Sequence, residues 1–207
     1  MMFGEDVCGA LEPRQDRRLP ATTRHSKISA EETKSSIIPT SGAETLHLGL
    51  LTIQQHDQMV DLLAQLHAHY NPGSRLARET FNAHLQRLCS GDSQLHLVTA
   101  SQDNRLLGFA AVYLVASLVE PEPDKRLQCA LKELFVAPEE RSRGVGRALM
   151  EWVARFAIDQ GCCRIDWTVK SSNARGIDFY ERLGAQLVPD RLSYRLERSG
   201  VSLVAAP

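Results

Sequence analysis

Apolar residues recur along the chain with two different periods, and the changes of period predict the order of its helices and strands. Between Thr52 and Asn71, apolar side chains follow one another at intervals of three and four residues, which is the spacing of one helix face. The same spacing predicts helices at residues 76–88, 144–160 and 173–183. Short apolar runs bounded by turn residues predict strands at residues 46–51, 95–100, 106–118, 128–136, 164–169 and 192–196.

The order of these elements predicts the fold class. A polar turn at residues 101–104 joins two of the strands and is typical of a hairpin. Helices separate the later strands from one another. We therefore expect an α/β domain in which a mixed sheet carries helices on both faces.

The first 43 residues lack such a pattern. Prolines, charged residues and a Ser/Thr-rich stretch leave the apolar residues too scattered to form a buried face. A basic run at residues 14–18 is interrupted by Asp16 and has no amphipathic repeat, so we do not interpret it as a targeting segment. We expect residues 1–43 to be a disordered leader and residues 44–207 to form one domain.

Composition and charge narrow the class of function. A chain of 207 residues with 43% hydrophobic residues suits one domain with a sizeable core. Its 24 Lys and Arg against 25 Asp and Glu give a net charge of −1, which provides no general attraction to phosphate polymers or membrane surfaces. Because no apolar run approaches the length of a membrane helix, we expect neither a nucleic-acid partner nor a membrane partner.

Cysteine and histidine positions bear on the compartment and on metals. The five cysteines show no CxxC spacing, and no secretory hydrophobic region begins the chain, so we expect reduced thiols and a cytoplasmic location. His67 and His69 lie two residues apart on a predicted helix and point in different directions. We therefore expect no metal site.

A glycine-bearing turn links a predicted strand to a predicted helix at residues 141–146. Gly144 and Gly146 leave the backbone accessible at the helix N-terminus, where free N–H groups and the macrodipole favour an anion. Arg141, Arg143 and Arg147 add positive charge. The turn predicts a phosphate cradle, although two glycines alone would also suit a turn that only shapes the fold.

Two other phosphate-binding loops fit less well. A Walker A loop needs Lys-Ser/Thr after its last glycine, where Arg147 and Ala148 stand, and a dinucleotide fingerprint needs a third glycine at Leu149. Asp166 does lie 20 residues after Gly146, where a ribose-binding acid is expected. A dinucleotide-dependent oxidoreductase therefore stays an alternative, weakened because only about 60 residues follow the cradle.

Two motifs, in a fixed order, carry a resemblance to a known family. The first, Arg/Gln-x-x-Gly-x-Gly/Ala after a strand, is matched by Arg141, Gly144 and Gly146. The second reads Asn-x-x-Ala-x-x-Phe-Tyr-x-x-Leu-Gly-Phe. It appears here, with Gly for Ala and Ala for Phe, as Asn173, Gly176, Phe179, Tyr180, Leu183, Gly184 and Ala185. On these motifs, residues 131–185 resemble the GCN5-related N-acetyltransferase (GNAT) family.

The resemblance implies a fold, a co-substrate and a reaction. The fold is the acyl-CoA N-acyltransferase (GNAT) fold, with a mixed, mostly antiparallel central sheet. The co-substrate is acetyl-CoA, whose diphosphate rests on backbone N–H groups of the cradle and whose pantetheine arm lies along the preceding strand. The acetyl group passes to an amine by direct attack in a ternary complex, without an acyl-cysteine. The residues implied to hold acetyl-CoA are Leu134, Phe135, Val136, Arg141, Ser142, Arg143, Gly144, Val145, Gly146, Arg147 and Asn173.

The resemblance also implies catalytic residues. Tyr180 matches the tyrosine that protonates the departing thiolate, although it would also suit a core position of its helix. Glu133 alternates with Leu131 and Phe135 on one predicted strand face, an apolar setting that would raise the pKa of a base. Asp166 and a water molecule are kept as alternative bases, and Asn173 could instead cap its helix.

The acceptor is the part that the sequence defines least. The resemblance is strongest to acetyltransferases of small amines such as polyamines and diamines, so we expect a primary amine of a small molecule. We place it against the first two helices and the loop 120–125, whose Glu120, Glu122 and Asp124 would suit a cation. The alternatives are a protein or peptide acetyltransferase acting on an N-terminus or lysine, and a non-catalytic regulator that binds acyl-CoA. A homodimer stays open, because dimers are common in the family.

Overall fold

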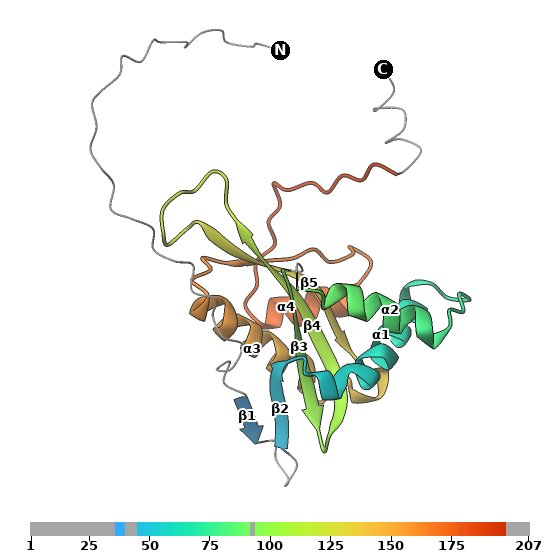
Figure 1. The fold of residues 1–207 in the computed structure, drawn as a ribbon. Coiled ribbons are helices and arrows are strands. Elements are labelled where there is room, and N and C mark those ends of the chain that lie inside the picture. The colour runs from blue at the N-terminus through green and yellow to red at the C-terminus, as the bar shows by residue number, and fades with distance from the viewer. Residues whose placement is uncertain (1–35, 40–44, 92–93, 198–207) are drawn as a thin grey trace, which may run out of the picture. The chain divides into compact units, whose positions relative to one another are not determined.

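The computed structural model describes residues 36–39, 45–91 and 94–197 of the 207-residue chain (Figure 1). Its strands are β1 (Ser36–Pro39), β2 (Thr45–Leu50), β3 (Leu95–Gln102), β4 (Arg105–Ala116), β5 (Leu127–Val136) and β6 (Ile165–Asp166). Its α-helices are α1 (His56–Tyr70), α2 (Arg78–Leu88), α3 (Val145–Asp159) and α4 (Ala174–Arg182), with short 3-10 turns η1 (Ile53–Gln55) and η2 (Pro138–Glu140). Each predicted helix is found, with ends close to those expected. None of the helices in these ranges is long and apolar enough to cross a bilayer.

The strands form one six-stranded sheet in the order β1-β2-β3-β4-β5-β6. Neighbouring strands run antiparallel, except β5 and β6, which run parallel. The predicted hairpin joins β3 to β4 through Asp103 and Asn104, which both have positive φ as a tight two-residue turn requires. The predicted fold class, a mixed and mostly antiparallel sheet, is confirmed.

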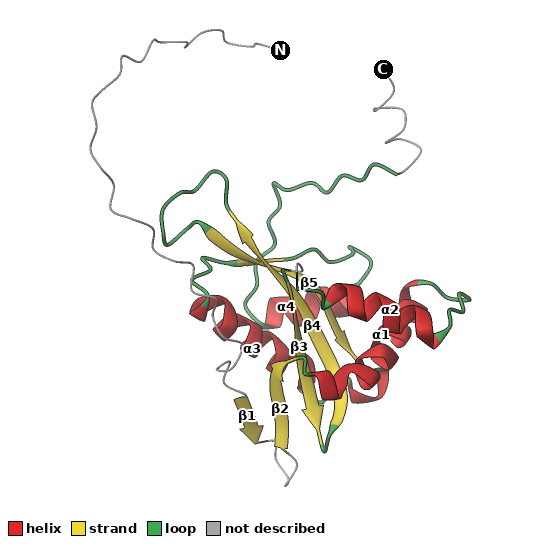
Figure 2. Cartoon of the chain, viewed as in Figure 1, coloured by secondary structure: helices red, strands yellow, loops and turns green. Residues whose placement is uncertain are grey.

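Helices cover both faces of this sheet (Figures 1 and 2). On one face, α3 buries an apolar stripe that includes Leu149, Trp152 and Val153 against alternate residues of β2 to β5. On the other face, α1 and α2 bury Met59 and Leu85, among others, against the intervening residues of β3 to β5. Two cores, one on each side of the sheet, therefore hold α1 and α3 at the two faces of β5.

A β-bulge at Lys132 changes which face the second half of β5 presents. Ala111 of β4 pairs with Glu133 while Val112 pairs with Leu131, so Lys132 has no partner in the β4–β5 register. As a result, Leu131 packs in the α3-side core and Phe135 packs in the α1-side core. The expectation that Leu131, Glu133 and Phe135 share one face was wrong for Leu131, because strict alternation does not allow for an extra residue.

Strands β5 and β6 separate after a short stretch of pairing. Only Cys129 with Ile165 and Ala130 with Asp166 are paired, so the predicted strand 164–169 is reduced to two residues. Residues 131–136 continue to pair with β4 on their other side. Their β6-facing edge therefore has no strand partner in the described part of the chain, so its backbone groups are free of strand pairing, although the carbonyl oxygen of Val136 accepts from the Arg141 side chain.

The predicted last strand is absent. Residues 192–196 carry no strand assignment, and Leu192 and Tyr194 are 76% and 87% exposed. Alternating apolar residues are necessary for a half-buried strand but not sufficient, since a strand also needs a neighbour with which to pair. The segment therefore continues as the extended green trace that follows α4 in Figure 2.

The expected boundary between leader and domain was also wrong by one strand. Residues 36–39, which we placed in the leader, form β1 and pair antiparallel with β2. Residues 1–35 and 40–43 of the expected leader lie outside the described residues. The domain thus begins before residue 44.

Candidate active site

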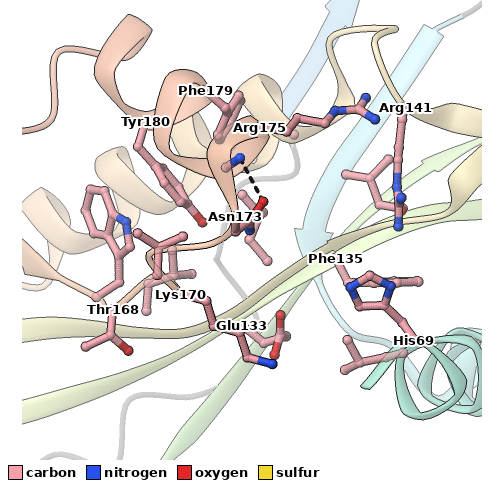
Figure 3. Close-up of a pocket in the computed structure, with 18 of the residues that line it drawn as sticks. His69, Glu133, Phe135, Arg141, Thr168, Lys170, Asn173, Arg175, Phe179 and Tyr180 are labelled. Atoms are coloured by element: carbon pink, nitrogen blue, oxygen red, sulfur yellow. Dashed lines mark hydrogen bonds between the residues drawn. The ribbon is translucent and has the colours of Figure 1, made fainter. Parts of the chain in front are cut away.

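A pocket of about 1030 Å³ occupies the space where β5 and the segment after β6 diverge. Its walls come from the end of α1, residues 131–136 of β5, the turn before α3, residues 167–173, and α4 (Figure 3). Eleven of the thirteen site residues expected from the sequence line it, Arg143 and Val145 being the exceptions. Elements far apart in the sequence thus meet around one concavity.

The turn before α3 presents unpaired backbone donors. The N–H groups of residues 142–147 donate to no acceptor within the described part of the chain, whereas the N–H of Ala148 bonds the carbonyl oxygen of Gly144 at 3.0 Å. Ser142 and Gly144 have φ of 64° and 85°, with Arg143 between them. Left-handed residues among right-handed ones turn successive N–H groups toward one point, the geometry that binds anions.

The glycines of this turn are not explained by the chain's own packing alone. Gly144 occupies the left-handed region, which disfavours other residues, but a Cβ there would meet nothing within 4 Å. At Gly146, a Cβ would make only ordinary contacts with Phe179 and Val136. Space left open beside unpaired amides fits a ligand that approaches the backbone closely, so the geometry favours a phosphate cradle over a turn that only shapes the fold.

Two arginine side chains border this cradle. The Nε of Arg141 donates to the carbonyl oxygen of Val136 at 3.1 Å, and its guanidinium lies 6.0 Å from the ring centre of Phe135. Arg175 of α4 donates from Nη2 to the Oγ of Ser142 at 3.1 Å. Arg175 was not predicted as a site residue from the sequence, because its partner is 33 residues away. Its charge adds to that of the helix N-terminus.

The side chain of Arg143 turns away from the pocket. Its Nη1 donates to Oε2 of Glu140 at 2.7 Å, and Glu140 is only 3% exposed. The other carboxylate oxygen of Glu140 is held by Arg105. A carboxylate beside the cradle is thus neutralised by two arginines. Arg143 and Val145 can therefore contact an anion in the cradle only through their backbone N–H groups, and not through their side chains.

Tyr180 lines the pocket from α4 and is partly buried between two other rings. Its ring centre lies 4.9 Å from that of Trp167 and 5.1 Å from that of Phe179. Burial, together with the nearby Glu133 and Tyr70, raises the pKa of Tyr180 to about 12. The phenol is therefore protonated at neutral pH and can donate a hydrogen bond. The ring packs against its neighbours and also lines the pocket, so the position of Tyr180 is compatible with both sequence interpretations, and its role as the acid stays a prediction.

Glu133 lines the pocket from β5, and Tyr70 of α1 contacts it there. The Oη of Tyr70 donates to Oε1 of Glu133 at 3.3 Å. Burial raises the pKa of Glu133, opposed by this hydrogen bond, by a backbone N–H, and by the charges of Lys132 and His69. A carboxylate with a raised pKa is suited to accept a proton near neutral pH.

Tyr70 itself was missed as a site residue. In the sequence it is one more apolar position of the helical pattern between Thr52 and Asn71. Its partner Glu133 is 63 residues away, so no local motif could have joined the two. The pKa of Tyr70 is raised, mainly by burial and then by Glu133, which keeps its hydroxyl a donor.

Asp166, the alternative base, does not line the pocket. Its Oδ2 accepts from Arg164 at 2.8 Å and from Arg191 at 3.4 Å. Partial burial favours the neutral acid, but the two arginines outweigh it and lower the pKa of Asp166 below its ordinary value. An ion-paired carboxylate outside the pocket is a poor base, so Asp166 is not brought into the site.

Asn173 caps α4 and also lines the pocket. Its Oδ1 accepts from the N–H of Gly176 at 3.0 Å. The acidic residues Glu120, Glu122 and Asp124 do not line the pocket, so the expectation that they surround the acceptor gains no support.

Within the described residues, no group of three or more His, Cys, Asp or Glu could hold a metal ion.

The chain is similar in sequence to known acetyltransferases. Residues 60–185 match the model of the Acetyltransferase (GNAT) family. Thialysine N-epsilon-acetyltransferase of Bos taurus is 39% identical over 56 residues, which are 27% of this chain and 33% of that protein. L-ornithine N5-acetyltransferase NATA1 of Arabidopsis thaliana is 35% identical over 57 residues, 28% of this chain and 25% of that protein. The chain thus matches a third or less of the length of these relatives.

A solved structure resembles the chain over a longer span. The integron cassette protein VCH_CASS6, from the mobile metagenome of V. cholerae, superposes with a TM-score of 0.70 and 26% identity. The match covers 78% of this chain and 98% of that one. The architecture around the pocket is therefore shared as a whole, and not only in the two motifs.

Proposed function

The chain belongs to the GNAT acetyltransferase family, and on that premise we propose that it transfers an acetyl group from acetyl-CoA to a primary amine of a small molecule. The observation that carries the proposal is one pocket in which the N–H groups of residues 142–147, unpaired within the described part of the chain, lie together with Glu133 and Tyr180. The first feature suits a diphosphate, and the other two suit a base and an acid.

The donor side of the pocket fits acetyl-CoA, which when bound supplies the acetyl thioester. The N–H groups of the cradle would hold the diphosphate, with Arg175 and Arg141 contributing charge beside it. The β6-facing edge of residues 134–136 would pair with the amides of the pantetheine arm, as an added strand does. An N–H group of the same edge would stabilise the negative charge that develops on the carbonyl oxygen.

Glu133 would serve as the base. An alkyl amine with a pKa near 10.4 is neutral in only about one molecule in 2,500 at pH 7, so removing its proton is a substantial part of the barrier. Glu133 faces the pocket with a raised pKa and would take this proton directly or through a water molecule. The amine then attacks directly, and no acyl-cysteine is needed.

Tyr180 would serve as the acid, and its strength depends on Glu133. A phenol with a pKa of about 12 is a weaker acid than a thiol near 8.5, so complete proton transfer to a thiolate is uphill by about 5 kcal/mol. The charge of Glu133 is one cause of that raised pKa. When Glu133 accepts the proton of the amine, this charge disappears. Tyr180 therefore becomes a stronger donor at the stage when the thiolate departs.

Two panels of measurements test the function. Thiol release from acetyl-CoA is followed with polyamines, aminoglycosides, amino acids and peptides, and CoA binding is measured separately by calorimetry. We expect CoA binding and thiol release with at least one small amine. CoA binding without transfer to any amine would identify an acyl-CoA-binding regulator, and transfer to peptides alone would identify a protein acetyltransferase. No affinity for CoA would overturn the proposal.

The compartment and the oligomeric state are also proposed. Four cysteines in the described ranges, Cys89, Cys129, Cys162 and Cys163, are free thiols, which supports a reducing cytoplasm. Exposed apolar side chains such as Leu187, Leu192 and Tyr194 in the segment after α4 support a homodimer. Light scattering on the purified protein tests the dimer, and a mass of about 23 kDa at all concentrations would exclude it.

A further inference from the structure

Three side chains form a connected cluster at the part of the pocket that we call the acceptor end, defined by Tyr70, Glu133 and Lys170. Tyr70 bonds Glu133 through its hydroxyl, and the Nζ of Lys170 lies 5.0 Å from the centre of the Tyr70 ring. The three residues come from α1, β5 and the segment between β6 and α4, and all line the pocket. Figure 3 labels Glu133 and Lys170. Two groups of opposite charge are thus placed around one phenol ring.

Lys170 lacks an anionic partner among the described residues, unlike three of the six other lysines and arginines that line the pocket. Arg147, Arg182 and Arg195 pair with Glu151, Asp178 and Glu197, respectively. Lys170 forms no ion pair in the part of the chain that the structure describes, and its ammonium lies over the ring of Tyr70. Its ammonium is therefore available to an anion in the pocket.

Carboxylates are scarce among the residues that line the pocket. Only Glu133 and Glu140 carry one, and both oxygens of Glu140 are held by Arg105 and Arg143. Glu133 remains, and its proposed task is to receive the proton of the attacking amine. A second ammonium group on the acceptor would therefore meet Lys170 rather than a carboxylate, which is unfavourable.

We propose that Lys170 binds an anionic group of the acceptor, such as a carboxylate, so that the enzyme prefers amino-acid-like amines to polyamines. This inference rests on the proposed acetyltransferase function and names the acceptor class of the same site. Lys170 and Glu133 both contact Tyr70, so a molecule of amino-acid size can present its anion to one and its amine to the other. Lys170 is thus a specificity-determining residue, and it has no part in the proton transfers.

Matched pairs of acceptors test the proposal with the full-length protein. L-Lysine and cadaverine differ only in the carboxylate, as do L-ornithine and putrescine, and L-lysine amide keeps the shape of lysine without the negative charge. We expect kcat/KM to favour each amino acid over its decarboxylated partner by about tenfold, the effect of one charge-assisted contact. L-Lysine amide should behave like cadaverine.

Substitution of Lys170 should remove this preference. In Lys170→Met the ratio of kcat/KM for L-lysine and cadaverine should fall to about one, and in Lys170→Glu it should favour cadaverine. Lys132→Met is the matched control, because Lys132 also lines the pocket and forms no ion pair with any described residue, whereas the ammonium over the Tyr70 ring belongs to Lys170. It should keep the wild-type ratio. Calorimetry on the CoA-saturated protein should show the same preferences in binding. The wild type and Lys132→Met should bind L-lysine more tightly than cadaverine, and Lys170→Met should bind the two about equally.

Results that contradict the role of Lys170 can be told apart from results that contradict the acetyltransferase function. Equal or better use of cadaverine by the wild type, or an unchanged ratio in Lys170→Met, would overturn the role of Lys170 while leaving the enzyme an acetyltransferase. Turnover of aminoglycosides or peptides, but of neither amino acid, would also overturn it. Absence of transfer to every amine would instead contradict the proposed function itself.

Discussion

The cradle and the acceptor end lie in one pocket but are built in different ways. The cradle consists of backbone N–H groups from six consecutive residues, 142–147. The acceptor end consists of the side chains of Tyr70, Glu133 and Lys170, from three separate elements. A backbone site depends on local conformation and tolerates many side chains, whereas a side-chain site depends on how distant elements pack together.

This difference separates what should be common to the family from what is particular to this chain. A diphosphate looks the same in every reaction that uses CoA, so a fixed arrangement of amides can serve all of them. Acceptors differ in charge and shape, so the side chains that meet them must differ too. Some variants should change only the affinity for CoA, and others only the rate of acetyl transfer or the choice of acceptor. Such variants test directly whether the cradle and the acceptor end act independently.

Tyr180→Phe should have the largest effect. Removal of the hydroxyl should lower kcat about 100-fold, the usual contribution of a general acid, and should leave the affinity for CoA unchanged. Tyr194→Phe is the control, since Tyr194 is 87% exposed and lies outside the pocket. Steady-state kinetics and calorimetry measure the two quantities. An unchanged kcat would remove the acid role from Tyr180.

The sequence predicted the glycine-bearing turn between β5 and α3 because its signal is local. Glycine spacing, the preceding strand and the following helix all lie within about 20 residues, and the resemblance covered the same stretch. The α3 stripe and the β3–β4 hairpin were predicted for the same reason, since each depends on a short repeating pattern or a single turn.

Features that depend on contacts between distant parts of the chain could not be predicted in this way, whether they lie at the acceptor end, beside the cradle or outside the pocket. Tyr70 and Arg175 act on partners 63 and 33 residues away, which no spacing rule connects. The bulge at Lys132 reverses the alternation on which the face of Leu131 was predicted. The expected strand 192–196 had a suitable pattern but no neighbour with which to pair. Each of these features is decided by tertiary packing and not by local sequence.

Gly144→Ala should have the next largest effect, on the cradle alone. Gly144 has φ of 85°, so a Cβ there costs about 1–2 kcal/mol or shifts the turn. We expect affinity for CoA to fall about tenfold as the amides move out of place. Gly161→Ala is a matched control with φ of 78° just after α3, far from the turn in sequence and outside the pocket.

The two glycine variants share their effect on stability and differ in binding. Both should lower the free energy of unfolding by a similar amount, measured by chemical denaturation, because both place Ala in the left-handed region. Only Gly144→Ala should bind CoA more weakly in calorimetry. Equal CoA affinity in the two variants would mean that the turn does not hold the diphosphate.

Arg175→Met should have a smaller effect on the same step. Its guanidinium is exposed and contacts Ser142, so it would add charge near a bound diphosphate without defining the cradle. We expect CoA affinity to fall about fivefold at low salt and less at high salt, because exposed charges are screened. The exposed Arg155, on α3 and outside the pocket, provides the control variant Arg155→Met. An effect independent of ionic strength would argue against an electrostatic role for Arg175.

Tyr70→Phe should have the smallest effect on rate, and its effect on the pH profile gives the sharpest comparison of the two regions. Glu133 must be ionised to accept a proton, so log kcat/KM should rise with one additional unit of slope below its pKa, which burial raises. The hydrogen bond from Tyr70 favours the ionised form and lowers that pKa. Its removal should therefore move the acidic limb to higher pH.

Two other variants serve as controls for this limb. Glu133→Gln should abolish the limb, and Gly144→Ala should leave its position unchanged. A shift to lower pH in Tyr70→Phe would mean that Tyr70 does not stabilise the base, and that the acceptor end is less connected than its contacts indicate.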